Sequence, residues 1–326
     1  MAKRLASLGL MLAFTAALVV YAFWGVDWPQ LGRLLAGGSY WVLAPFMACL
    51  AVYHWLAALR WRWILRPLGR YTTGQVFPAM MIGFGGNNLL PARLGEILRA
   101  VVFARQQGLT KSGVLMTLVV ERVLDVAAIF AFYLAAVATI SPFPQDIQAG
   151  AHTVAVLMAG VLAGLVWFAG WPHQVEALWN ALAAWLPAGP REKGGALVHA
   201  MAQGLSSLTS PGLLAPMLFH SVVRWGFSGV MVMLSLQAFG QPIGFGAAMI
   251  VIAVSALAVS LPGPPGFFGV MQATFVFSLL PFGVARETAL ASSMLFLLGQ
   301  WAPTTAVGLY YYLHYHLTLA DAQVDT

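Results

Sequence analysis

The sequence carries very little charge: only 8% of its 326 residues are Asp, Glu, Lys or Arg, whereas 60% are hydrophobic. A soluble domain has about 25% charged residues to keep its surface hydrated, so this composition excludes a soluble globular protein. The mean hydropathy is +0.82. Several apolar stretches approach the ~20 residues that cross ~30 Å of hydrocarbon. The sequence therefore predicts an all-α polytopic membrane protein.

Cysteine and recognisable catalytic motifs are also scarce. Cys49 is the single cysteine, so no internal disulfide is possible. The glycines of "GFGG" (83–86) lack the lysine and the preceding strand of a phosphate-binding loop, and no Ser/His/Asp set follows from the spacing. The net charge of +6 is scattered among apolar segments, which indicates membrane orientation and anionic lipid rather than nucleic acid. We expect no metal, no cofactor and no nucleic-acid partner.

About six segments are predicted to span the membrane. The first follows Lys3 and Arg4 like a secretory signal, but it is long and lacks a cleavage pattern, so we expect it to be retained. The spans are expected at about 5–24, 40–60, 112–140, 151–170, 211–238 and 288–313. Residues 173–209 are less apolar, and the helical spacing of Val175, Leu178 and Leu182 predicts an amphipathic segment on the cytoplasmic membrane surface.

The basic residues predict the orientation. With the N-terminus inside, the outer loops keep only Arg33 and Arg286, and an excess of Lys and Arg marks the cytoplasmic side. We therefore expect both termini in the cytoplasm. The eleven basic residues assigned to inner segments are Lys3, Arg4, Arg60, Arg62, Arg66, Arg70, Arg99, Arg105, Lys111, Arg191 and Lys193.

Two apolar regions are interrupted and are interpreted as re-entrant hairpins. Region 74–107 has basic flanks, so it is expected to enter from the cytoplasm and turn at Gly85–Pro91; region 244–281 is expected to enter from outside. Halves 1–145 and 146–320 would then form an inverted repeat within one integral membrane domain, 1–326. Alternatively, arms such as 244–260 cross fully, giving eight to ten spans. The expected turn residues are Gly86, Pro91, Gly263, Pro264, Pro265, Gly266, Gly269 and Gln272.

The polar residues of the first hairpin predict an anion site. Asn87 and Asn88 can cap helix ends or satisfy carbonyls freed by the turn, and Pro91 suits the first turn of the returning helix. Arg93 and Arg99 follow on one face of that helix, and a helix start with arginines is suited to phosphate. The predicted lipid headgroup-binding residues are Asn87, Asn88, Arg93, Arg99 and Arg224.

Ionisable residues also fall within the predicted spans. Such groups are costly in hydrocarbon and usually face a cavity or one another. Glu121, Arg122 and Asp125 are expected either to lock helices together as an ion-pair network or to face an interior cavity. His220 and Arg224 are expected either to neutralise a lipid phosphate or to pair with Glu121 or Asp125. Glu96 is expected either to take up a proton during transport or to buttress its arginines. The predicted proton or ion-pair residues are Glu96, Glu121, Arg122, Asp125 and His220.

Three motifs, "GNNLLPARLGEILR", "ERVLD" and "PPGFFGVMQATFV", resemble the flippase-like membrane family typified by the transmembrane region of lysylphosphatidylglycerol synthases. The resemblance covers roughly residues 5–313. It implies a stand-alone protein of the bacterial inner membrane, without the soluble transferase domain, that moves or handles lipids with polar headgroups. Gln272 stands where the family's second glycine motif is often followed by an acidic residue.

Two classes of function are therefore expected. The first is a lipid flippase or transporter for a phospholipid or polyprenyl-phosphate-linked lipid with an anionic headgroup, which is not an enzyme. The alternative is a membrane-embedded transferase acting on a lipid-linked substrate, with Glu96, Glu121 or Asp125 as general base. An accessory subunit of a lipid or polysaccharide export system is a further alternative, and the partners would be a membrane lipid and either a second copy or an export complex.

Overall fold

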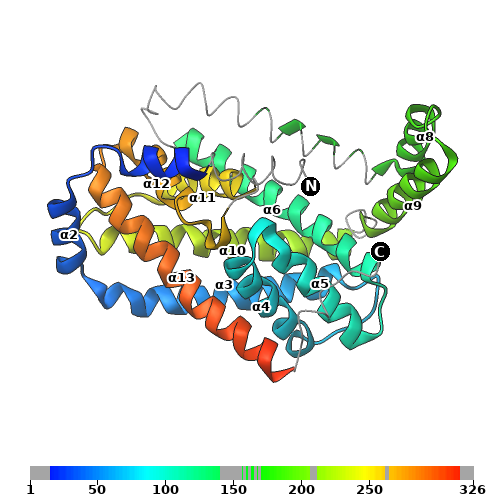
Figure 1. Cartoon of the computed structure of the whole chain (residues 1–326), viewed down its shortest axis with the longest axis horizontal. Coiled ribbons are helices and arrows are strands. Elements are labelled where there is room, and N and C mark those ends of the chain that lie inside the picture. Colours follow the sequence, from blue (N-terminus) through cyan, green and yellow to red (C-terminus); the bar gives the residue numbers. More distant parts are fainter. Residues whose placement is uncertain are drawn as a thin grey trace.

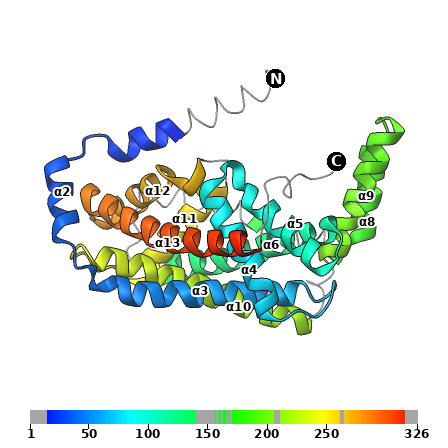
Figure 2. The ribbon, with the colours of Figure 1, turned by 60° about the horizontal axis from the view of Figure 1, so that its bottom comes forward.

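The computed structural model describes residues 15–139, 170–205, 211–260 and 264–315, together with isolated positions between 156 and 167. These residues are helical or form short connections, and no strand occurs among them. The prediction of an all-α protein is confirmed. The longest helices are α3 (Leu43–Ile64), α6 (Lys111–Thr139), α10 (Pro211–Gln237) and α13 (Arg286–His314). Helices α3, α10 and α13 run along the length of the molecule (Figures 1 and 2).

Within the described residues, three segments are long and apolar enough to cross a membrane: Tyr40–Ile64, Gly212–Gln237 and Pro265–Phe282. Helices α6 and α13, each of 29 residues, cover two further predicted spans. Most of the predicted spans 5–24 and 151–170 lies outside the described residues. The chain is thus a multi-pass membrane protein, and the count of six spans stays a prediction.

The first interrupted region consists of α4 (Thr73–Leu89), the 3-10 turn η2 (Pro91–Arg93) and α5 (Leu94–Gln107). The prediction that Gly85 and Gly86 lie in the turn was wrong, because α4 continues through both and the chain turns at 90–93. These glycines allow close helix packing instead. A Cβ on Gly86 would come within 2.9 Å of Gly95 Cα in α5, and one on Gly85 within 3.2 Å of Gly308 Cα in α13. Pro91 opens η2 as expected.

The second interrupted region consists of α11 (Phe245–Ser260), η4 (Pro265–Phe267), α12 (Val270–Leu279) and η5 (Leu280–Phe282). Gly266 and Gly269 have φ of 68° and 83°, which glycine adopts without strain. The side chain of Gln272 accepts a 2.7 Å hydrogen bond from the Gly269 N–H and so fixes the start of α12. Pro264 and Pro265 lie at the turn, whereas Gly263 lies outside the described residues.

The helices pack in matched pairs across the two halves of the chain. Helix α3 packs along α10, α4 along α13, and α11 along α6. Within each half, α4 packs on α5 and α5 on α6, while α11 packs on α12 and α12 on α13. One apolar core contains Phe46, Phe275 and Phe296, and a second contains Trp61 and Phe103.

Two smaller parts lie at opposite ends of the bundle (Figure 2). Helix α2 (Trp28–Gly37) begins at Asp27, whose side chain accepts a hydrogen bond from the Gln30 N–H. At the other end, α8 (Pro172–Leu182) and α9 (Ala188–Leu205) form a helical pair that covers most of the predicted amphipathic segment. Val175 is buried, whereas Leu182 and Trp185 are 63% and 82% exposed. The position of the amphipathic segment on the membrane surface stays a prediction.

Candidate functional site

Two carboxylates on α6 form the centre of a buried charge network. Glu121 and Asp125 are one helical turn apart, and both are at most 4% exposed. Glu121 is 3.0 Å from Arg60 Nη2 through Oε1 and 2.8 Å from Arg99 Nη2 through Oε2. Since Arg60 is on α3 and Arg99 on α5, Glu121 ties three helices together.

Asp125 is bound from two other helices. Its Oδ1 accepts hydrogen bonds from Arg60 Nη1 at 2.5 Å, Arg224 Nη1 at 3.2 Å and Trp225 Nε1 at 2.9 Å. Arg60 Nη1 also donates to Ser221 Oγ on α10. The pairing of Arg224 with Asp125 is one of the alternatives that the sequence left open. Residues of α3, α6 and α10 therefore meet at this carboxylate.

The network becomes more accessible towards the tip of the first hairpin. Glu96 Oε1 lies 3.5 Å from both Arg93 Nη1 and Arg122 Nη2. The side chains of Arg93, Glu96 and Arg122 are 23%, 21% and 40% exposed, whereas that of Arg60 is fully buried. The accessible end thus presents two guanidinium groups and one carboxylate.

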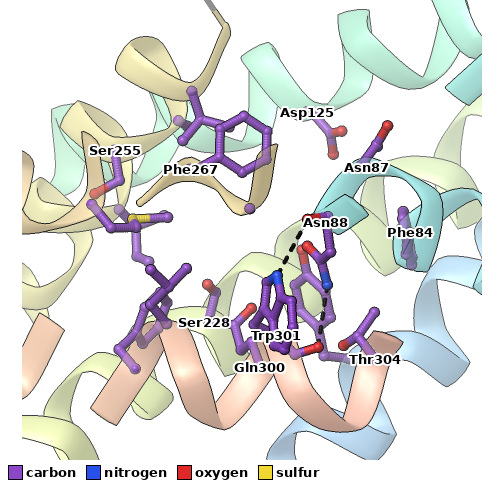
Figure 3. A pocket seen from close by; sticks show the side chains of 18 of the residues that line it. Phe84, Asn87, Asn88, Asp125, Ser228, Ser255, Phe267, Gln300, Trp301 and Thr304 are labelled. Carbon is purple, nitrogen blue, oxygen red and sulfur yellow. Dashed lines mark hydrogen bonds between the residues drawn. The ribbon is translucent and has the colours of Figure 1, made fainter. Parts of the chain in front are cut away.

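This accessible end forms part of the lining of a cavity of about 220 Å³. Its charged lining residues are Arg93, Glu96, Arg122, Asp125 and Arg224, and its apolar lining residues include Ile252, Ala256, Val259, Met271 and Phe296. In Figure 3, Asp125 and Asn87 lie at one end and Ser255 at the other, with Phe267 between them. The volume is below the ~300–1,000 Å³ of typical small-molecule pockets, so the cavity can hold a headgroup but not a whole lipid.

Asn88 joins the first hairpin to α13. Its Nδ2 donates to Trp301 O at 3.3 Å and to Thr305 Oγ1 at 2.9 Å, while Trp301 Nε1 donates to Asn88 O. The contact between Asn88 and Trp301 is drawn in Figure 3. Asn88 therefore holds the hairpin in place, and both Asn87 and Asn88 line the cavity.

The tips of the two interrupted regions meet at the cavity. The Arg93 guanidinium lies 5.7 Å from the centre of the Phe267 ring. Among the described residues, these two are also the non-glycine residues with positive φ, 58° and 59°. A left-handed conformation of such residues is strained by about 1–3 kcal/mol each and persists only where the surroundings enforce it. The contact between the tips is therefore a strained point at the wall of the cavity.

Three of the predicted headgroup-binding and ion-pair residues, Arg99, Glu121 and His220, do not line the cavity. Arg99 is 1% exposed and lies between Glu121 and the ring of Trp61, 4.5 Å from its centre. His220 is half-buried, and its Nδ1 contacts the Pro216 carbonyl of its own helix at 2.5 Å. Within the described ranges, no three His, Cys, Asp or Glu side chains are grouped to hold a metal ion.

Four residues of the site were not predicted from the sequence: Arg60 in the network, and Tyr53, Trp225 and Trp301 in the cavity lining. Arg60 and Arg99 were both counted as cytoplasmic charges, but their burial at 0% and 1% removes them from that count. Nine inner basic residues against two outer ones remain, so the expected orientation keeps its support. Ala57 and Ala58 precede Arg60 in "LAALRW", and such small residues were the available signal that a helix packs closely there.

The membrane-capable helices and the polar cavity between them define an integral membrane protein. The chain belongs to the family of the lysylphosphatidylglycerol synthase TM region, whose model matches residues 7–308. This confirms the resemblance carried by the three motifs, and it indicates a membrane function related to lipids. No curated protein and no solved structure matches the chain.

Proposed function

We propose that the protein is a lipid carrier that moves a lipid with an anionic headgroup across the membrane. The observation that supports this most is the mixed lining of the cavity, because three arginines and two carboxylates line it together with apolar side chains. A headgroup phosphate suits the arginines, and the start of the hydrocarbon tail suits the apolar side chains.

The lengths of the hairpin helices support a carrier with re-entrant segments. At 1.5 Å per residue, α4, α5, α11 and α12 are about 25, 21, 24 and 15 Å long, short of the ~30 Å of hydrocarbon. The apolar segment Pro265–Phe282 contains the non-helical Gly266, so its regular helix begins only at Val270. Each interrupted region packs against a long helix of the opposite half. This matched packing is what an inverted repeat with alternating access requires.

The same proposal includes a bacterial inner-membrane location with both termini in the cytoplasm. It is supported by the family and by the nine inner basic residues that remain after Arg60 and Arg99 are removed. Under this orientation the first hairpin opens inwards and the second outwards.

A flipping assay tests the proposal. Liposomes with the purified protein and a fluorescent anionic phospholipid are treated with an impermeant quencher, and the protected fraction is followed over time. We expect wild-type protein to accelerate flipping and Arg93→Ala to slow it. Arg62→Gln is the control, because Arg62 lies on α3 beside the Trp63 ring and away from the cavity. Wild-type liposomes that flip no faster than empty ones would contradict the proposal.

A lipid-linked transferase is the second candidate, and the accessibility of Glu96 favours it. This carboxylate lines the cavity and is held only by contacts of 3.5 Å, so it is placed to accept a proton from a bound nucleophile. Incubation of the protein with lipid and activated donors separates the two. If a modified lipid forms and its formation requires Glu96, the protein is a transferase and the proposal of a carrier is wrong.

A further inference from the structure

The charge network around the cavity contains more positive than negative groups. Five guanidinium groups face three carboxylates, which leaves an excess of two positive charges among these side chains. The members of the network are Arg60, Arg93, Arg99, Arg122 and Arg224 with Glu96, Glu121 and Asp125. Protonation of any of the carboxylates would enlarge the excess.

Each of the two buried carboxylates is already in contact with several arginines. Glu121 lies within 3.5 Å of Arg60, Arg99 and Arg122. Asp125 lies within 3.7 Å of Arg60, Arg122 and Arg224. Each buried carboxylate therefore already has three arginine neighbours.

The arginines at the cavity have donors to spare. In the described part of the chain, Nε of Arg93, Arg122 and Arg224 is buried without a hydrogen-bond partner, and all three side chains line the cavity. A buried donor without a partner costs about 1–3 kcal/mol, and more when it is charged. The side chains of Arg93 and Arg122 are 23% and 40% exposed, so a bound anion can approach their guanidinium groups. Arg93 and Arg122 converge on Glu96 Oε1, so their guanidinium groups are neighbours that can share one such anion.

We propose, resting on the lipid carrier proposed above, that the cavity selects a headgroup with two negative charges. A terminal phosphate monoester carries about −1.5 to −2 at pH 7 and offers three acceptor oxygens. A phosphodiester carries one charge, and two of its oxygens are esterified. The excess of two positive charges therefore matches a lipid that ends in a phosphate monoester. A lipid whose only phosphate is a phosphodiester carries one negative charge and matches this excess less well.

Competition between lipids of equal tails tests this selectivity. The purified protein in detergent is offered phosphatidic acid and phosphatidylglycerol at pH 8, where the monoester is fully charged, and the bound lipids are quantified by native mass spectrometry. We expect phosphatidic acid to be preferred at least about tenfold, the factor that one additional charge-assisted hydrogen bond provides. Equal binding, or a preference for phosphatidylglycerol, would overturn the inference but leave the lipid carrier standing.

Two variants with opposite changes of charge exclude a merely structural effect. Arg122→Gln reduces the excess to one, so the preference for phosphatidic acid should fall towards unity. Glu96→Gln raises the excess to three, so the preference should increase. Arg191→Gln, on the exposed surface of α9, is the control. Changes in the same direction in both cavity variants would refute the charge-matching argument.

Inorganic phosphate distinguishes a lipid site from a site for free phosphate. We expect 1 mM phosphate to displace little phosphatidic acid, because it gains nothing from the apolar side chains. If phosphate displaces the lipid completely and neither lipid is flipped in liposomes, the carrier function fails. The cavity would then be a binding site for a soluble anion and not for a lipid headgroup.

Discussion

Replacement of Arg60 by glutamine is the sharpest test of the buried network. Arg60 is fully buried and binds Glu121 at 3.0 Å, Asp125 at 2.5 Å and Ser221 at 2.9 Å. Loss of one partner from a buried ion pair destabilises a protein by about 3–5 kcal/mol. Both carboxylates keep other arginines within 3.2 Å, so we expect the lower end, about 3 kcal/mol.

Thermal unfolding in detergent measures this effect. A loss of about 3 kcal/mol corresponds to a decrease in Tm of about 6–12 °C at 2–4 °C per kcal/mol. Arg62→Gln is the matched control two residues further along α3, and it should unfold within about 1–2 °C of wild type, since surface changes are worth about 0.5 kcal/mol. If Arg60→Gln unfolds at the temperature of Arg62→Gln, the network does not stabilise the fold and the reasoning is refuted.

Three other predictions concern the first hairpin. Gly95→Ala should destabilise the protein by about 1–3 kcal/mol, because the added Cβ would collide with backbone of α4, whereas Gly32→Ala, with nothing within 4 Å, should not lower Tm. Single cysteines replacing Thr72 and Leu109, in a background without the native cysteine, should both react with impermeant thiol reagents from the cytoplasmic side; labelling on opposite faces would rule out the hairpin. Arg93→Lys should slow flipping by about tenfold, because an ammonium group cannot bind phosphate in bidentate fashion, and full activity would place the phosphate elsewhere.

Several members of the charge network could be selected from the sequence because intramembrane charge is so unusual. Glu121, Asp125 and Arg224 were selected simply because charged residues in apolar runs require partners, and the structure brings all three into one network. The helix start at Pro91 followed from its fixed backbone angle. In contrast, Gly86 was misplaced, because a glycine that breaks a helix and one that lets a neighbouring helix approach look alike in a sequence.

By itself, the sequence determined that the chain lies in a membrane and that its fold is all-α. With 8% charged residues and long apolar runs, the chain has no stable alternative to membrane helices, because every backbone polar group must be satisfied internally in lipid. That result depends only on composition and local periodicity.

Only the tertiary structure decided which charges belong to the site. Arg60 ends an apolar run just as Arg62 does, yet one is fully buried in the network and the other remains near the surface. The difference arises from the side of α3 that faces α6, because Glu121 and Asp125 become neighbours of Arg60 only when those helices pack. The partner of a charge is set by contacts between residues far apart in the chain, and the sequence order of one helix does not contain that information.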